Sequence, residues 1–379
     1  MALRWGILGS GRIAKDFACS MMSVEGSEVV AVASRKASPA LEAFGAAFGC
    51  RTHASYEALA ADTEVQCVYV ATIHPTHFAL AKMALEASKH VLVEKPFAMN
   101  LREAEELTAL AKAKGCFLME AMWTRFLPAT LKAIDMVRQG EIGEVLSAQA
   151  SVGGLWYSPE ELADAPARAA AKKLGSGVLL DVGCYAIAAP YMFFRALGVR
   201  DDQVHVQASV GALDVAGCDI SGVLTLSYGA DGEVERTAVA HSSWRYMLPN
   251  EVVLHGTKGV LTLNSVWGAD QVSVNGPAMH PGEPERLNEV TKAPYAAPAA
   301  AAEGKWSGRG DATTSWRSGM AHEIQEVQEC IAAGKLESDR WPMACTLKVM
   351  GLMDASRRMM GVAYDSDACS VSLQDSASL

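Results

Sequence analysis

The hydrophobic pattern of the first 122 residues alternates between short apolar runs and amphipathic stretches. The runs are rich in β-branched residues and lack strict alternation, as in strands buried on both faces of a sheet. The predicted strands are LRWGIL (3–8), EVVAVAS (28–34), QCVYVAT (66–72), HVLVEK (90–95) and CFLMEAM (116–122). Apolar residues recur at i, i+3 and i+4 between them, which predicts helices. We therefore expect a doubly wound parallel sheet with helices on both faces in an α/β domain of residues 1–122.

After Trp123 the pattern changes to period-two segments separated by turn signals, which is typical of antiparallel strands. These segments are 143–153, 204–211, 220–229, 233–244 and 250–264. Further helices are predicted at about 183–197, at 319–334 and at 343–361. Residues 277–314 show little periodicity and indicate a long surface loop. We expect an α+β domain over 123–365, whose large, predominantly antiparallel sheet is covered by helices on one face, and a polar tail over 366–379.

The net charge of the chain indicates which classes of partner it can bind, and its cysteine usage indicates the compartment in which it folds. The 379-residue chain has a formal net charge of −10 and no basic run, so it would repel phosphate backbones and anionic lipid. Nucleic acids and membrane surfaces are not expected partners. The nine cysteines form no CxxC pair, and the N-terminus shows no signal-like segment. Both features favour free thiols in a cytoplasmic protein.

A glycine motif lies between the first predicted strand and the helix that follows it. Gly9, Gly11 and Ala14 form G-x-G-x-x-A. Small residues allow a sharp turn and let a pyrophosphate approach the backbone at a helix N-terminus. This position favours a dinucleotide-binding Rossmann domain over the alternative, a glycine turn without a ligand. The residues expected to bind the cofactor here are Gly9, Ser10, Gly11, Arg12 and Ile13.

The end of the second predicted strand bears on which dinucleotide binds. An NAD site usually has Asp or Glu there, on the ribose 2′-hydroxyl, whereas this chain has Ser34-Arg35-Lys36. Ser34 can donate a hydrogen bond to a 2′-phosphate, and Arg35 can form a charge-assisted pair with it. We therefore predict NADP(H). The alternative is a solvated cluster at the start of a helix.

Polar residues also end two other predicted strands of the first domain. Glu94 and Lys95 follow the apolar run at 90–95, at the ligand-facing edge of such a sheet, although a solvated lysine at a strand end is the plain alternative. Thr72, His74 and His77 come to the same edge. All five are candidate cofactor contacts. The histidines have no evident third metal ligand, so no metal is predicted, and helix-capping or core roles stay open for them.

Asp181, Gly183 and Tyr185 form D-x-G-x-Y at the start of an apolar helix. With the glycine motif, EKP at 94–96, HGTKGVLTL and MDASRRMMGVAY, the chain resembles the glucose-fructose oxidoreductase, inositol dehydrogenase and MocA family to about residue 364. MEAMWTRFLP (119–128) makes it most similar to the dimeric dihydrodiol dehydrogenases and NADP-dependent D-xylose 1-dehydrogenases of that family.

The resemblance implies roles for several side chains. Tyr185 would exchange a proton with the substrate hydroxyl as general acid and base. A free phenol has a pKa of ~10, and an ammonium within ~4 to 6 Å, here Lys95, favours its ionised form. Asp181 would orient the site or bind a substrate hydroxyl. Trp123 and Arg125 would line the pocket, although Arg125 could equally be a structural ion-pair partner.

The resulting hypothesis is an NADP-dependent oxidoreductase that acts on a CH–OH group of a trans-dihydrodiol or an aldose. An inositol or other polyol dehydrogenase of the same family is the first alternative. A non-catalytic NADP-binding regulator is the second. Members of the family commonly associate through the antiparallel sheet, so a homodimer, or a tetramer, is expected.

Overall fold

The structure is a computed structural model that describes residues 2–229, 234–276, 286–290 and 319–368. These residues form two compact units. The first contains the described residues up to Phe126 and those from 319 to Leu347. The second contains Leu127 to residue 290 and Lys348 to Asp367. Each unit is described by itself.

The first unit is built on a six-stranded sheet of order β3-β2-β1-β4-β5-β6, and every pairing in it is parallel. Its strands are β1 (Leu3–Leu8), β2 (Ser27–Ala33), β3 (Arg51–His53), β4 (Cys67–Val70), β5 (His90–Glu94) and β6 (Leu118–Ala121). The strand order reverses between β1 and β4. Since β–α–β crossovers are right-handed, helices on the two sides of this reversal cover opposite faces of the sheet. The predicted doubly wound α/β domain is confirmed.

The helices of the first unit, apart from α3, lie in the segments where the sequence pattern predicts helices. They are α1 (Arg12–Met21), α2 (Pro39–Phe48), α3 (Tyr56–Ala60), α4 (His77–Glu86), α5 (Leu101–Lys114) and α11 (Met320–Ala332). The side chain of Ser38 accepts the Leu41 N–H at the start of α2, and that of Asn100 accepts the Glu103 N–H at the start of α5. Such N-caps satisfy donors that a helix leaves unpaired.

An aromatic cluster fills the core beneath the glycine turn. The rings of Phe17 on α1 and Tyr69 on β4 stack with centroids 3.7 Å apart, and Trp5 on β1 meets Phe17 edge-on at 5.5 Å. All three side chains are fully buried. Aromatic pairs add about 0.5–1.5 kcal/mol each beyond the burial of their area. The packing fixes α1, and with it the glycine turn, against β1 and β4.

The second unit is built on an eight-stranded sheet of order β14-β13-β12-β11-β7-β10-β9-β8. Its strands are β7 (Val145–Gly153), β8 (Val204–Leu213), β9 (Asp219–Tyr228), β10 (Arg236–Ser243), β11 (Val252–Gly256), β12 (Val260–Leu263), β13 (Gln271–Asn275) and β14 (Arg286–Val290). Neighbouring strands are antiparallel except β7 and β10, which pair in parallel. The predominantly antiparallel sheet is therefore confirmed.

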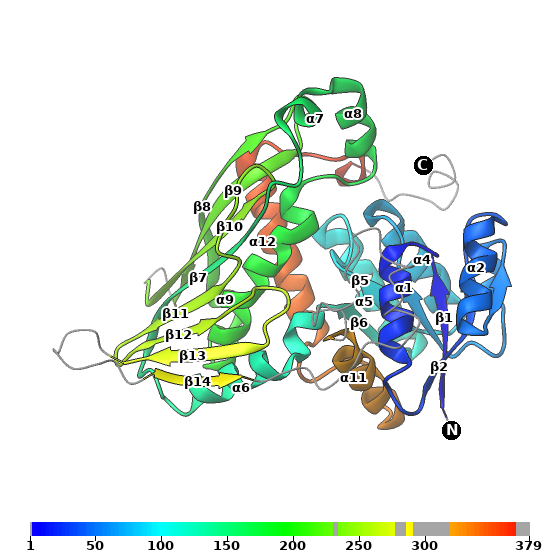
Figure 1. The fold of residues 1–379 in the computed structure, drawn as a ribbon, viewed down its shortest axis with the longest axis horizontal. Helices are drawn as coiled ribbons and strands as arrows, with labels where there is room; N and C mark the ends of the chain where they lie inside the picture. The colour runs from blue at the N-terminus through cyan, green and yellow to red at the C-terminus, as the bar shows by residue number, and fades with distance from the viewer. Residues whose placement is uncertain (1, 230–233, 277–285, 291–318, 369–379) are drawn as a thin grey trace. The chain divides into compact units, whose positions relative to one another are not determined.

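Helices cover one face of this sheet. They include α9 (Cys184–Ala196) and α12 (Met343–Met360), which belongs to the second unit from Lys348 onward and lies on the same side as α9 (Figure 1). The Ser356 hydroxyl of α12 meets that of Ser209 on β8 at 2.6 Å, which joins helix and sheet. The shorter helices are α6 (Pro128–Arg138), α7 (Pro159–Ala163) and α8 (Ala165–Lys173). None of the described helices is long and apolar enough to cross a bilayer.

The structure differs from the sequence predictions at several places. It adds short strands and helices that were not predicted, namely β3, β13, β14, α3, α6, α7 and α8. The loop expected at 277–314 is wrong for Arg286–Val290, which forms β14, and the rest of it lies outside the described residues. Of the tail at 366–379, residues 366–368 are described, and a 3-10 turn spans Asp365–Asp367.

The first unit also takes in residues 319–347, which the sequence analysis assigned to the second domain. Two long-range hydrogen bonds, one part-buried and one buried, explain why. Ser27 of β2 donates to Gln328 of α11 at 2.6 Å, and the indole N–H of Trp341 donates to Glu120 of β6 at 3.1 Å. Returning segments of this kind carry no local sequence signal, because the contact that places them is more than 200 residues away along the chain.

Candidate active site

Predicted cofactor residues of the first unit, and the predicted substrate residue Trp123, follow the carboxyl ends of parallel strands. Gly9 follows β1, Ser34 follows β2, Thr72 follows β4, Lys95 follows β5 and Trp123 follows β6. In a parallel sheet these ends lie at one edge, and ligands bind where the strand order reverses, here between β1 and β4. The fold therefore brings the five segments to one edge of the sheet.

The turn from β1 to α1 has the geometry that a dinucleotide phosphate requires. Gly9 has φ +108°, and a Cβ there would lie 2.4 Å from the Ala71 carbonyl oxygen, so only glycine fits. At Gly11, which is exposed, a Cβ would meet no atom within 4 Å, so the space above the turn is open. No side chain caps the first N–H groups of α1. Ser10, Gly11, Arg12 and Ile13 thus surround an open helix N-terminus, which suits a pyrophosphate.

The segment after β2 presents a cation to solvent. Arg35 is exposed, and its charge acts on Tyr56 at the start of α3, whose pKa is raised by burial and partly lowered again by Arg35. The Ser34 hydroxyl donates to the Lys36 carbonyl at 2.7 Å, so in this conformation its proton is used within the turn. The predicted contact of Ser34 with a 2′-phosphate needs a different hydroxyl orientation, and Arg35 is the stronger candidate.

His77 joins two loops of the sheet edge. It is fully buried, and its Nδ1 lies 2.9 Å from the Pro96 carbonyl oxygen while Nε2 lies 3.2 Å from that of Thr72. Burial, with the nearby charges of His74 and Lys95, lowers the pKa of His77 to about 4. Of the roles that the sequence left open, the structure therefore supports a core role for His77, because both ring nitrogens already face backbone carbonyls. His74 is half-buried and stacks edge-on against it at 5.9 Å.

A buried carboxylate braces the backbone beside Lys95. Glu94 accepts the Tyr69 hydroxyl at 2.5 Å through one oxygen and the Lys95 N–H at 3.0 Å through the other. Burial raises the pKa of Glu94, and the Lys95 ammonium is the largest influence opposing that rise. Lys95 itself is half-buried and precedes Pro96 through a cis peptide bond. The pairing ties the end of β5 to the aromatic core, so Lys95 extends from a rigid base.

Glu120 and Glu323, buried carboxyl groups of the first unit that repel the charge of Glu94, were not predicted from the sequence. Glu120 on β6 accepts from Trp341 and from the Thr346 hydroxyl at 2.9 Å, whereas neither oxygen of Glu323 on α11 has a hydrogen-bond partner in the part that the structure describes. Burial raises the pKa of both, and repulsion from Glu94 adds to it. A glutamate inside the apolar run LMEA was the available signal for Glu120.

Trp123 and Arg125 lie in the short 3-10 helix Trp123–Phe126, directly after β6. Trp123 is 6% exposed and Arg125 is half-buried. This helix packs against α11 within the first unit. The helix thus carries a largely buried indole and a guanidinium, and their predicted role in lining a substrate pocket stays a prediction.

The second unit contributes Asp181 and Tyr185 from one continuous helical segment. Residues Leu179–Gly183 form a π-helical turn that runs into α9, which starts at Cys184. Asp181 and Tyr185 are four positions apart, so they lie on neighbouring positions of one side. Tyr185 is 6% exposed and Asp181 is half-buried. Turns of the π type are frequent at functional sites, because they redirect side chains within a helix.

No three His, Cys, Asp or Glu side chains are grouped as a metal site within residues 2–229, 234–276, 286–290 and 319–368. The structure thus presents two sets of candidate residues. The cofactor residues and Lys95 belong to the first unit, and Asp181 and Tyr185 belong to the second.

Two family models match the chain. The first, described as an oxidoreductase family with an NAD-binding Rossmann fold, matches residues 3–122, and the second, the GFO/IDH/MocA C-terminal domain, matches residues 130–262. A zebrafish (Danio rerio) protein named trans-1,2-dihydrobenzene-1,2-diol dehydrogenase is 35% identical, over 97% of this chain and 100% of its own. The human protein of the same name is 32% identical, over 97% of this chain and 99% of its own.

Solved structures show the same fold. A 3-ketoreductase from Actinomadura kijaniata, KijD10, crystallised with NADP and TDP-benzene, superimposes with a TM-score of 0.75 at 23% identity, covering 95% of this chain and 98% of its own. An aldose-aldose oxidoreductase from Caulobacter crescentus, complexed with glycerol, gives a TM-score of 0.73 at 22% identity, with 95% and 97% covered.

Proposed function

The chain belongs to the GFO/IDH/MocA oxidoreductase family and is an NAD(P)-dependent dehydrogenase, and we propose that it uses NADP(H) to oxidise a CH–OH group of a trans-dihydrodiol or an aldose. The observation that carries the substrate class is the similarity, over nearly the full length, to relatives named dihydrodiol dehydrogenase. Because the sequence also resembles the D-xylose 1-dehydrogenases, we include the anomeric hydroxyl of an aldose as the other group that the protein would oxidise.

The chemistry is proposed for Tyr185 and Lys95. When bound, the nicotinamide ring of NADP accepts the hydride from the substrate carbon. Tyr185 takes the proton of the same hydroxyl as the carbonyl forms, and it returns a proton in the reverse direction. The Lys95 ammonium favours the ionised phenol during this transfer. Glu94 accepts the backbone N–H of Lys95, and this restrains the backbone from which the Lys95 side chain must reach the phenol.

The other site residues are proposed to bind and orient the substrate. Asp181 accepts a hydrogen bond from a second hydroxyl of the diol, since it lies on the same side of the helix as Tyr185. Trp123 forms a flat wall for the ring, and Arg125 of the same 3-10 helix supplies a cation. Holding the reacting carbon in one place accounts for much of the acceleration of such a reaction.

A panel of substrates with both cofactors tests the proposal. Initial rates are followed by the absorbance of the reduced nicotinamide with trans-1,2-dihydrobenzene-1,2-diol, D-xylose, D-glucose and myo-inositol. We expect turnover of the dihydrodiol or an aldose, with NADP⁺ preferred. Turnover of inositol alone would contradict the substrate class. Binding of NADPH without turnover of any substrate would favour a non-catalytic regulator.

The choice of NADP leads to a prediction for Arg35. Replacing Arg35 by alanine removes the cation expected to pair with the 2′-phosphate, which NAD lacks. We expect the KM for NADP⁺ to rise roughly 10- to 100-fold, since a charge-assisted bond is worth about 1.5–3 kcal/mol, and the KM for NAD⁺ to stay almost unchanged. Lys36→Ala is the matched control, because Lys36 is an exposed cation of the same turn. An equal loss for both cofactors in Arg35→Ala would refute the assignment.

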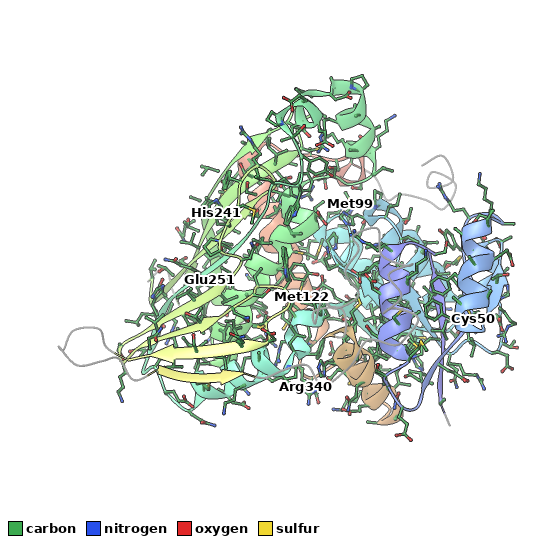
Figure 2. The ribbon with its side chains drawn as sticks, viewed as in Figure 1. Cys50, Met99, Met122, His241, Glu251 and Arg340 are labelled. Carbon is green, nitrogen blue, oxygen red and sulfur yellow. The ribbon has the colours of Figure 1, made fainter. Side chains whose placement is uncertain are left out.

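A homodimer through the eight-stranded sheet is part of the proposal. Side chains on the face away from α9 and α12 include His241 (Figure 2) and several apolar residues. Val210 is 66% exposed and pairs across the strands with Val223, and Leu146 is 42% exposed. Exposed apolar side chains on one face of a sheet suit a twofold contact with a second copy. Light scattering should give twice the chain mass.

A further inference from the structure

Asp219, which the sequence analysis did not identify, lies against the helical segment that carries Asp181 and Tyr185. It is the first residue of β9 and is fully buried. One of its carboxylate oxygens accepts the Leu179 N–H at 2.6 Å, at the start of the π-helical turn. The backbone N–H groups at the start of a helix have no partner within the helix, so an acceptor there sets where the helix begins.

The turn before Leu179 is shaped around the same carboxylate. A Cβ on Gly177 would lie 2.5 Å from the second oxygen of Asp219 and 2.4 Å from the Tyr364 hydroxyl, so a glycine is required for both groups to approach the backbone. Tyr364 donates to the Ser176 carbonyl at 2.8 Å. Asp219 and Tyr364 therefore hold Ser176, Gly177 and Leu179, immediately before Asp181 and Tyr185.

We propose that Asp219 is a positioning residue for the proton-transfer site: by accepting the Leu179 N–H it fixes the first turn of the segment that aims Asp181 and Tyr185. This inference rests on the role of Tyr185 in the proposed function. A shift of the first turn rotates every side chain that follows it, and a displacement of about 1 Å in a reacting group can cost about 10²-fold in rate. Asp219 acts through the helix and does not itself touch the substrate.

The groups around Asp219 make its hydrogen bond with the Leu179 N–H dependent on pH. The second carboxylate oxygen has no hydrogen-bond partner among the described residues. Arg357 on α12 attracts the charge of Asp219, whereas Asp214 in the turn before β9 repels it, and Tyr364 and Cys218 lie close by. Asp214 is itself paired with the buried Arg168. Burial is the largest influence and raises the pKa of Asp219 to about 6.

The sign of the effect follows from the chemistry of the acceptor. An ionised carboxylate accepts an N–H more strongly than a carboxylic acid does. As the pH falls through about 6, Asp219 gains a proton, the hold on Leu179 weakens, and kcat should fall. For carbonyl reduction, in which Tyr185 acts as the acid and stays protonated at low pH, the wild-type protein should therefore show an acid limb in its pH–kcat profile that belongs to Asp219.

Two variants of Asp219 test the proposal. Asp219→Asn keeps the shape but offers only a neutral acceptor, as the protonated acid does, so kcat for carbonyl reduction near pH 7 should fall to the level that wild type reaches below pH 6, and the acid limb should disappear. Asp219→Ala removes the acceptor, so kcat should fall by roughly tenfold and backbone amides of residues 179–185 should exchange hydrogen faster than in wild type at the same pH. Asp201→Asn is the matched control, because Asp201 contacts the other end of α9 through Tyr191.

The outcomes separate this inference from the proposed function. An acid limb of carbonyl reduction that persists in Asp219→Asn, or unchanged exchange of residues 179–185 in Asp219→Ala, would overturn the positioning role. Tyr185→Phe is assayed in parallel. If that variant were fully active while exchange in Asp219→Ala was faster, the anchoring by Asp219 would stand and the assignment of Tyr185 would fail.

Discussion

Replacing Tyr185 by phenylalanine is expected to lower kcat by roughly 10²- to 10⁴-fold, the range that general acid–base groups contribute. The substitution removes only the hydroxyl from a side chain that is 6% exposed, so the packing of α9 should be retained. The affinity for NADPH, measured by fluorescence titration, should change by less than about twofold, because the predicted cofactor contacts lie in the first unit. The expected result is therefore a large loss of kcat with an almost unchanged affinity for NADPH.

Tyr191→Phe is the control for this variant. Tyr191 lies on the same helix, is 1% exposed and donates its hydroxyl to Asp201 at 2.6 Å. Its loss should cost some stability of the fold and leave kcat within about twofold. If Tyr185→Phe also turned over substrate at nearly the wild-type rate, another group would be the acid and base, and the proposed mechanism would be wrong.

Replacing Lys95 by alanine is expected to lower kcat by roughly 10²- to 10³-fold, comparable with the loss of one electrostatic donor from an active site. Without the ammonium the phenolate is less favoured, so the rising limb of the pH–kcat profile for oxidation should move to higher pH. Each unit of that displacement corresponds to about 1.4 kcal/mol of lost stabilisation of the anion. Lys95→Arg keeps a cation and should show a smaller displacement.

The matched control for Lys95 is Lys82→Ala. Lys82 lies on α4 of the same unit and is paired with Glu106 at 2.7 Å on the surface. A surface pair of this kind contributes little to stability, so activity should be unchanged. A pH profile of Lys95→Ala that kept the wild-type shape while only the KM for cofactor rose would assign Lys95 to cofactor binding alone.

The sequence predicted the strands that carry the site because each combines a buried apolar run with a polar ending. LRWGIL gave β1 with its bounds, and HVLVEK gave β5 with Glu94 and Lys95 at its end. The short elements were missed for physical reasons. β3 has only three residues, and α6 begins at Pro128, which is well accepted at the first position of a helix but is not by itself a signal for one.

Site residues that act through long-range contacts were not predictable in this way. The carboxyl groups of Glu323 and Asp219 are fully buried in the folded chain. No local sequence pattern marks a carboxyl group that folding will remove from solvent. His77 is an intermediate case. The sequence placed it at the correct edge of the sheet, but only the structure shows its ring nitrogens facing the carbonyls of Thr72 and Pro96.

The central claim is that the Lys95 ammonium and the Tyr185 phenol meet beside the bound cofactor. A crystal structure of the protein with NADP and a diol measures this directly, as the distance between Lys95 Nζ and Tyr185 Oη. We predict a separation within about 4 to 6 Å, the range over which one charge shifts the ionisation of another group. Side chains held far apart in that complex, with a different proton donor against the substrate hydroxyl, would contradict the account.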